Sequence, residues 1–318
     1  MIERLHPVNK DKKAGQLAFY HPDPDALHYV MWSSGCDSTL LLYELLKKYG
    51  PDKVVAISCR FPWLNKKKAS HEVVFRQRFI DMLKRNNTGL DTFTHYTIDV
   101  TWQYRPKNTK NGGYYSSGLL QAYSWLSIAF PLLKPNSWFY IGTIRGDDLV
   151  TLYLQQFQTM FEACAKMLNK EVHLCMPYVG YTKAKVLTKL IEYGIYDYTW
   201  FCEKPESPTS GPCSRCHPCE THTEALAAIA TDPSLSHEIQ FKAVTELGGL
   251  LLTRSQKIKA EKAQQEKAQQ EKEESLQRAV KQIDKDGDIS VVGDTIYLKS
   301  NIELQNQPNE PETQDSPE

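Results

Sequence analysis

Apolar positions between residues 26 and 200 follow two alternating spacings. Short runs rich in β-branched and aromatic residues predict buried strands, at 28–32, 53–58, 93–100 and 137–142. Apolar residues three and four positions apart predict helices between and after these runs, at 37–50, 70–86, 117–130, about 150–169 and 182–193. Strands that alternate with helices indicate an α/β fold, in which a parallel sheet has helices on both faces.

The pattern changes at both ends of this core. The segment 261–270 repeats EKAQQ and is polar nearly all round, which is typical of a solvated helix rather than of a coiled-coil seam. "DISVVGDTIYLKS" predicts a hairpin that turns at Gly293-Asp294. We therefore expect an N-terminal extension (1–25) and a core domain that includes a cysteine-rich segment (26–235). A helical extension (236–283), a small β-hairpin (284–300) and a disordered acidic tail (301–318) should follow.

Charge and composition narrow the class of protein. Lys plus Arg (38) balances Asp plus Glu (38), so no net field favours direct binding to nucleic acid or to a membrane surface. No apolar run reaches the roughly 18 residues of a membrane-spanning helix, and the N-terminus lacks the apolar core of a secretion signal. We expect a cytoplasmic protein, whose eight cysteines are thiols or metal ligands rather than disulfides.

The segment after the first predicted strand, "WSSGCDSTL", gathers small and hydroxylated side chains before a helix. A helix N-terminus has unpaired N–H groups and favours an anion, and Gly35 lets the backbone approach a ligand. The segment lacks the lysine and spacing of a Walker A loop and the glycines of a dinucleotide-binding loop. A simple helix cap by Asp37 or Ser34 is the alternative. We favour a phosphate-binding loop, because a cap needs few hydroxyls.

"SSGCDST" resembles the SGGxDS signature of the PP-loop ATP pyrophosphatases, which split ATP into AMP and pyrophosphate while adenylating a substrate. The resemblance implies ATP and Mg²⁺ as cofactors, with Asp37 as a catalytic Mg²⁺ ligand. Ser34 departs from the signature, which has glycine there; a serine keeps the turn if its φ stays negative. The implied ATP-binding residues are Trp32, Ser33, Ser34, Gly35, Cys36, Asp37, Ser38, Thr39 and Leu40.

A cysteine cluster follows the core pattern. Cys202 is followed after ten residues by Cys213, Cys216 and Cys219, and Cys-x2-Cys spacing directs thiolates at one metal ion. We expect one structural Zn²⁺ with all four positions filled. The alternatives are c-type haem attachment, a [4Fe–4S] cluster and disulfides; export is needed for the first, no redox site is evident for the second, and the third conflicts with a cytoplasmic protein.

The combination resembles more narrowly the 7-cyano-7-deazaguanine synthase family of queuosine biosynthesis. Its supporting segments are the cysteine spacing, "LLQAYSWLSIAF", "YIGTIRGDD" and "MPYVGYTKAKVLTKLIEYG". The resemblance covers roughly residues 28–227. It implies an ATP-dependent ligase that converts 7-carboxy-7-deazaguanine and ammonia into 7-cyano-7-deazaguanine. Lys183 is then a second catalytic residue that contacts phosphate, although a solvated surface lysine is the alternative. The expected partners are the deazapurine and ammonia, and a homodimer is compatible with the pattern.

Other candidate residues carry weaker signals. Asp147 and Asp148 follow the fourth strand and either contact substrate or metal or cap the next helix. His71-Glu72 matches a His or Arg near a Glu in the family, or is a solvated helix start. The segment 102–118 either closes over a base or is a mobile loop. The remaining cysteines, none with an activating partner in the sequence, are Cys36, Cys59, Cys164 and Cys175.

Two other functions remain open. One is a divergent PP-loop ligase that stops at an amide or joins a deazapurine to another amine. The other is an inactive nucleotide-binding subunit that acts through its tail. Ser34, the ten-residue cysteine gap and the polar extension are the features that keep both open.

Overall fold

The structure is a computed structural model that describes residues 23–60, 66–100, 117–286, 289–292 and 295–298. The expected N-terminal extension up to residue 22, most of the segment 102–118, the hairpin turn and the acidic tail lie outside the described residues. The chain divides into two compact units, Met1–Arg254 and Ser255–Glu318.

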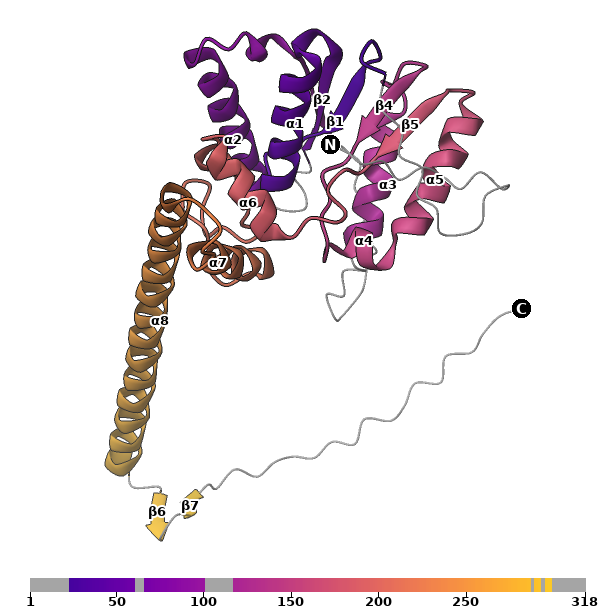
Figure 1. The fold of residues 1–318 in the computed structure, drawn as a ribbon. Helices are drawn as coiled ribbons and strands as arrows, with labels where there is room; N and C mark the ends of the chain where they lie inside the picture. Colours follow the sequence, from indigo (N-terminus) through magenta and orange to yellow (C-terminus); the bar gives the residue numbers. More distant parts are fainter. Residues whose placement is uncertain (1–22, 61–65, 101–116, 287–288, 293–294, 299–318) are drawn as a thin grey trace, which may run out of the picture. The chain divides into compact units, whose positions relative to one another are not determined.

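Among the described residues of the first unit, strands and helices alternate (Figure 1). The strands are β1 (His28–Met31), β2 (Val54–Arg60), β3 (Thr94–Asp99), β4 (Ser137–Tyr140) and β5 (Val172–Cys175). The helices are α1 (Cys36–Tyr49), α2 (Lys66–Arg85), α3 (Ser117–Ala129), α4 (Asp148–Leu152), α5 (Leu154–Met167), α6 (Lys183–Glu192), α7 (His217–Ala230) and α8 (His237–Asp286). Single 3-10 turns are η1 (Pro51–Lys53), η2 (Leu90–Thr92) and η3 (Tyr196–Tyr198).

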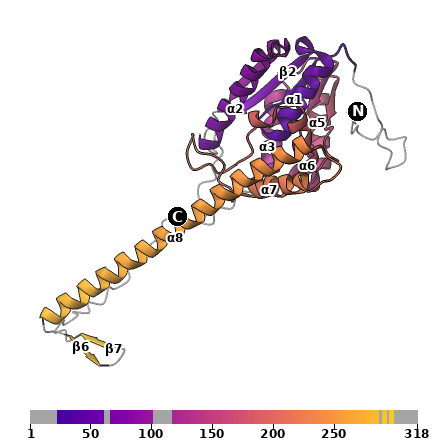
Figure 2. The same cartoon turned by 60° about the vertical axis from the view of Figure 1, so that its left-hand side comes forward.

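The strands form one parallel sheet with the order β3-β2-β1-β4-β5 across the described residues. Figures 1 and 2 show α1, α2 and α6 over one face and α3 and α5 over the other, and α7 packs against α6. A separate apolar core fills each interface, one around Leu40 and Phe79, the other around Phe139 and Phe157. The predicted parallel sheet with helices on both faces is confirmed.

Two local predictions were wrong. β5 was not expected, because its four residues are too few to show a strand pattern. The helix expected over 150–169 is broken at Tyr153 into α4 and α5. Both differences lie on the β4–β5 side of the sheet, where the elements are short.

The strand order fixes where a ligand can bind. The chain moves from β1 outward to β2 and β3, and then crosses back to β4 on the other side of β1. The strand order therefore reverses between β1 and β4, and ligands of open α/β sheets bind at the carboxyl ends of the strands at such a point. The loop after β1 and the loop after β4 meet there.

The second unit contains the rest of α8 and an antiparallel pair formed by β6 (Ile289–Val292) and β7 (Thr295–Leu298). The side chains of α8 between residues 255 and 278 are almost all exposed. Within the first unit, by contrast, Ala243 is fully buried and Ile239, Leu247 and Leu250 pack against the core. In the part of the chain that the structure describes, no helix is both long enough and apolar enough to cross a bilayer.

Candidate functional site

The loop between β1 and α1 presents a helix N-terminus at the point where the strand order reverses. The N-cap residue of α1 is Gly35, and no side chain of the described residues caps the helix there. The alternative of a simple cap by Asp37 or Ser34 is therefore wrong. The first-turn N–H groups of a helix have no acceptor within the helix, and without a cap they remain available to an anion.

Ser34 adopts the left-handed conformation that glycine adopts most readily, with φ of 67°. The expectation of a negative φ is wrong, because the turn from β1 into α1 requires this conformation. The side chain is fully buried, and its hydroxyl donates a hydrogen bond to the carbonyl oxygen of Ser33. The carbonyl of Ser34 in turn accepts a hydrogen bond from the Trp200 N–H at 2.9 Å. The loop thus keeps its shape with serine at this position, at the cost of backbone strain.

The nine predicted ATP-binding residues form the loop after β1 and the start of α1, and most of their side chains are buried. Ser33 is exposed, and Gly35 and Asp37 are partly exposed. The buried side chains hold the loop: the Trp32 indole N–H donates to the Thr39 hydroxyl (3.1 Å), and the Ser38 hydroxyl accepts from the Ser33 N–H (3.2 Å). Cys36, Ser38, Thr39 and Leu40 belong to the buried residues of α1. Direct contacts to a nucleotide can therefore come from the backbone, Ser33 and Asp37.

Asp37 forms an ion pair with Lys183, the first residue of α6. The Lys183 Nζ lies 2.9 Å and 3.1 Å from the two carboxylate oxygens of Asp37. Both side chains are largely buried, with 16% of Lys183 and 20% of Asp37 exposed. Although burial lowers it, the Asp37 carboxylate raises the pKa of Lys183 above its usual value. Lys183 is therefore a charged residue of the loop region and not a solvated surface lysine.

Asp147 organises the loop after β4. Its carboxylate accepts hydrogen bonds from the Ile144 N–H and from the Thr143 hydroxyl, both at 2.8 Å. Burial raises the pKa of Asp147, and the neighbouring charge of Asp37 acts in the same direction. The adjacent Asp148 is exposed. Asp147 thus stabilises a turn that lies next to Asp37.

Gly142 brings this loop into contact with the N-terminus of α1. A Cβ atom at Gly142 would lie 2.9 Å from the carbonyl carbon and oxygen of Asp37 and 3.0 Å from the Ser38 nitrogen. Real Cβ atoms do not approach backbone atoms this closely, so only glycine fits. The close approach sets the position of the helix N-terminus relative to β4.

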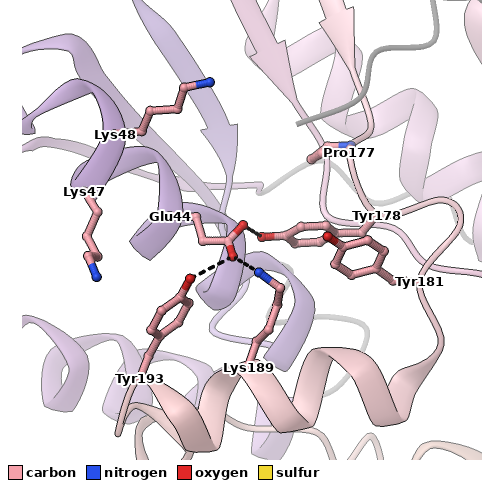
Figure 3. Close-up of a pocket in the computed structure, with 8 residues that line it drawn as sticks. All are labelled: Glu44, Lys47, Lys48, Pro177, Tyr178, Tyr181, Lys189 and Tyr193. Atoms are coloured by element: carbon pink, nitrogen blue, oxygen red, sulfur yellow. Dashed lines mark hydrogen bonds and ion pairs between the residues drawn. The ribbon is translucent and has the colours of Figure 1, made fainter. Parts of the chain in front are cut away.

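A second set of contacts holds α6 against α1 and so fixes Lys183. Glu44 accepts hydrogen bonds from the Tyr178 hydroxyl (2.6 Å), from Lys189 (2.6 Å) and from the Tyr193 hydroxyl (3.3 Å). Figure 3 shows these donors converging on the Glu44 carboxylate. They line a pocket of about 270 Å³ whose other labelled residues are Lys47, Lys48, Pro177 and Tyr181. Because the Glu44 carboxylate already accepts three hydrogen bonds, we infer that this network holds α1 and α6 together.

The cysteine cluster is assembled as a compact group. The sulfurs of Cys202, Cys213, Cys216 and Cys219 all lie within 4.8 Å of one another, and all four residues are buried. Individual S···S distances are 3.4 Å for Cys216–Cys219, 3.9 Å for Cys213–Cys219 and 4.0 Å for Cys202–Cys216. Four sulfurs at about 2.3 Å from one ion sit about 3.8 Å apart at the corners of a tetrahedron. The donor set therefore fits a single tetrahedral metal ion, and none of the eight cysteines forms a disulfide.

The cluster is connected directly to the nucleotide loop. The Trp200 indole N–H donates to the Cys202 carbonyl (2.7 Å), while the Trp200 backbone N–H donates to Ser34. His71 of α2 stacks on the Trp200 ring at 3.9 Å and contacts the Ser207 carbonyl through Nε2 at 2.9 Å. The alternative of a solvated helix start at His71 is therefore wrong. A metal ion bound to the cysteines would hold in place the segment around Trp200, which contacts the loop after β1.

Several residues of the site give no sequence signal of their own. Trp200 and Gly142 contact the loop through tertiary packing, and no spacing rule places them there. Arg76 is buried in α2 although its sequence context, "VVFRQRF", resembles an ordinary helix surface. A buried arginine can be recognised only once the helix has been packed on the sheet. The predicted closing segment 102–118 falls mostly outside the described residues.

Comparisons with known proteins give partial matches to this chain. Residues 147–230 match the family model described as queuosine biosynthesis protein QueC. The chain is 30% identical over 71 residues to a 7-cyano-7-deazaguanine synthase from Methanosphaerula palustris, a match that spans 22% of this chain and about a third (32%) of that relative. A solved U34-tRNA thiolase, NcsA from Methanococcus maripaludis with its [4Fe-4S] cluster, is 13% identical with a TM-score of 0.38. That alignment covers 71% of this chain and 74% of the thiolase.

The family match includes the Asp147 turn, Lys183 and all four clustered cysteines, whereas the loop after β1 lies outside it. The fold assignment rests on the strand order, because the structural similarity is low. The matched segment, which follows β4 and ends in α7, supports a QueC-like family of the PP-loop fold.

Proposed function

We propose that the chain is a cytoplasmic, ATP-dependent ligase that converts 7-carboxy-7-deazaguanine and ammonia into 7-cyano-7-deazaguanine. The observation that carries the proposal is the uncapped N-terminus of α1 with the Asp37–Lys183 pair beside it. The helix N-terminus would bind an anion, Asp37 would bind Mg²⁺, and Lys183 would bind a phosphate, and the three groups lie side by side. The QueC match over 147–230 supplies the substrate class.

The proposed reaction activates the carboxylate with ATP. A carboxylate oxygen attacks the α-phosphorus, the bond to the bridging oxygen breaks, and pyrophosphate leaves. Ammonia then displaces AMP at the acyl carbon and loses a proton, which gives the amide. A second adenylation at the amide oxygen releases another pyrophosphate, and the loss of AMP and of the two N–H protons gives the nitrile.

The residues of the chain act by positioning and by charge. The backbone N–H groups at the start of α1 bind phosphate oxygens, and Ser33 adds an exposed hydroxyl. Lys183, held charged by its surroundings, neutralises negative charge that develops on the phosphates. A Mg²⁺ ion bound to Asp37 would neutralise the departing pyrophosphate. No side chain is required as a covalent nucleophile, and burial raises the pKa of the Cys36 thiol in the loop.

The Asp37–Lys183 pair has a consequence for nucleotide binding. Both oxygens of Asp37 lie within 3.1 Å of the Lys183 ammonium group. Binding of Mg²⁺ to the carboxylate would loosen this pair and free the ammonium group for a phosphate. When the Mg²⁺–ATP complex binds, Asp37 would exchange Lys183 for Mg²⁺, and Lys183 would exchange Asp37 for a phosphate. Neither charge would then be buried without a partner.

We propose that the cysteine cluster holds one structural Zn²⁺. The four sulfurs have the spacing of a tetrahedral site around one ion. In a [4Fe–4S] cluster each thiolate binds a different iron, so the sulfurs are further apart than around a single ion. With four thiolates no coordination position stays open for substrate, and the ion would stabilise the Trp200 segment that supports the loop.

The direct test is the mass of the product. The purified chain is incubated with 7-carboxy-7-deazaguanine, ATP, Mg²⁺ and ammonium, and the products are identified by mass spectrometry. The nitrile is the expected product. An amide as the final product would favour the divergent ligase, and ATP binding without any pyrophosphate release would favour an inactive nucleotide-binding subunit.

The Asp37→Asn variant tests the role of the carboxylate. The amide keeps the size of the side chain but loses the charge that would bind Mg²⁺, so we expect turnover to fall by at least a hundredfold. The free energy of unfolding should also fall, by about 3 kcal/mol, because the buried ammonium group of Lys183 loses its carboxylate partner. Turnover and thermal unfolding are measured on the same preparation. Turnover within a few-fold of the wild type would contradict the assignment of Asp37.

A further inference from the structure

Arg76 presents a buried positive charge whose terminal nitrogens have no hydrogen-bond partner among the residues that the structure describes. Its side chain is 3% exposed, and neither terminal nitrogen, Nη1 or Nη2, has a hydrogen-bond partner. No ion pair to Arg76 occurs within the described residues. A buried arginine is normally bonded to a carboxylate or a phosphate, because desolvating an unpaired charge costs free energy. An unsatisfied buried donor of this kind indicates a missing ligand.

The charges around Arg76 offset its own charge only in part. Glu72 lies one helical turn earlier, but its nearest cation is Lys68 at 4.0 Å, and its side chain is 15% exposed. Arg60 is already paired with Asp99. Burial lowers the pKa of Arg76 and raises that of Glu72. The charge of each group acts on the pKa of the other in the opposite direction, although the two form no ion pair.

Arg76 lies against β2 and β3, on the side of β1 away from β4. Its charge acts on Cys59 of β2 and on His95 of β3. The Ser58 hydroxyl between them donates to the Trp32 carbonyl at 2.6 Å and contacts the His95 Nε2 at 2.9 Å. Trp32 immediately precedes the loop residues Ser33 to Gly35. The guanidinium is therefore beside β2, the strand next to the loop-bearing β1.

The proposed reaction brings two anionic groups into the site. The helix N-terminus, Lys183 and Mg²⁺ at Asp37 would bind the phosphates of ATP. The other anion is the carboxylate of the deazapurine, for which none of these groups is available. A guanidinium matches a carboxylate in shape, since its planar nitrogens can donate two parallel hydrogen bonds.

We propose that Arg76 binds the carboxylate of the substrate and positions it next to the nucleotide loop. The proposal rests on the proposed function, because the substrate comes from there. It makes Arg76 the residue that distinguishes 7-carboxy-7-deazaguanine from uncharged analogues. It also explains why an arginine without a protein partner is kept under the surface of α2.

Ligand binding without ATP tests this directly. The full chain is titrated calorimetrically with 7-carboxy-7-deazaguanine and with the neutral carboxamide analogue. The wild type should bind the carboxylate at least tenfold more tightly than the carboxamide. Arg76→Met should lose this preference, while Arg78→Met should keep it. Arg78 is a matched control, because it lies on the same helix but is exposed and packs over the Phe75 ring.

Thermal unfolding supplies an independent readout. Removing an unpaired buried charge should raise the Tm of the ligand-free protein, so Arg76→Met should unfold at a higher temperature than the wild type. A purely structural arginine would instead lower the Tm when replaced. If Arg76→Met does not fold, Arg76→Lys takes its place, and the preference for the carboxylate should then fall at least threefold because the planar fork is lost.

The outcomes separate the two proposals. If the wild type prefers the carboxylate and Arg76→Met, or its replacement, keeps that preference, the assignment of Arg76 is overturned and the proposed function stands. If the wild type binds neither compound while it still binds ATP, the proposed function fails, and the assignment of Arg76 to this carboxylate fails with it. Loss of the preference in Arg76→Met alone, with Arg78→Met unchanged, supports both.

Discussion

At the scale of single residues, the loop shows how a sequence can depart from a family signature and keep its geometry. Ser34 has a φ of 67°, a conformation that costs an L-residue about 1–2 kcal/mol. The strain is held in place by the buried side chain and by the Trp200 N–H bonded to the Ser34 carbonyl. The sequence could not predict this φ, because serine by itself disfavours it. The conformation follows from the turn that β1 and α1 require.

Ser34→Gly should therefore stabilise the protein relative to Ser34→Ala. Both variants lose the hydroxyl, but only glycine adopts the left-handed conformation without strain. We expect the free energy of unfolding of Ser34→Gly to exceed that of Ser34→Ala by about 1 kcal/mol, measured by urea denaturation of the two variants. Equal stability of the two variants would show that the loop backbone is not strained at this position.

At the scale of elements, the site depends on how helices and loops meet at the end of the sheet. The signature after β1 and the cysteine spacing could be recognised in the sequence, because each is local. The pairing of Asp37 with Lys183 could not, since it depends on α6 packing against α1 far along the chain. The family resemblance indicated Lys183 as a catalytic residue, but it did not indicate that Lys183 pairs with Asp37. β5 was missed because four residues carry too little pattern.

Gly142→Ala should separate the β4 loop from α1. The added methyl group would lie 2.9 Å from the Asp37 backbone, so the loop or the helix must shift. We expect ATP affinity to fall at least tenfold and the free energy of unfolding to fall by about 1–3 kcal/mol. Gly180→Ala is the control, because nothing lies within 4 Å of its added methyl group. Similar ATP affinities for the two variants would show that this contact does not position the loop.

Cys216→Ser should release the metal and destabilise the first unit. A structural ion contributes to the free energy of folding, so the loss should appear as a lower Tm and a zinc content well below one per chain. Cys164→Ser is the control, because Cys164 lies on α5 outside the cluster. Metal analysis of the wild type that finds iron and sulfide instead of zinc would refute the zinc assignment.

At the scale of the whole molecule, the candidate site lies within one of the two compact units. The loop, the Asp37–Lys183 pair, Arg76 and the cysteine cluster all precede Arg254, where the first unit ends. Beyond it, α8 is exposed and carries isolated pairs such as Lys262–Glu266 and Lys267–Glu271, which are worth little in water. The polar repeat predicted an exposed segment here, because it offers no apolar face to pack.

A chain truncated after Arg254 should keep its turnover. The truncation leaves the part of α8 that packs on the core through Ala243 and Leu247. We expect kcat and KM within about twofold of the full chain, with the same Tm for the first unit. The comparison is made by pyrophosphate release under identical conditions. A large loss of turnover with intact folding would show that the second unit completes the site or an assembly of chains.

The central claim is that the chain cleaves ATP between the α- and β-phosphates to activate a carboxylate. The most direct measurement is the identity of the nucleotide and phosphate products after turnover with 7-carboxy-7-deazaguanine and ammonium, separated by ion-exchange chromatography. The account predicts AMP and pyrophosphate in equal amounts, formed only when the carboxylate is present. ADP and inorganic phosphate as the sole products would contradict it.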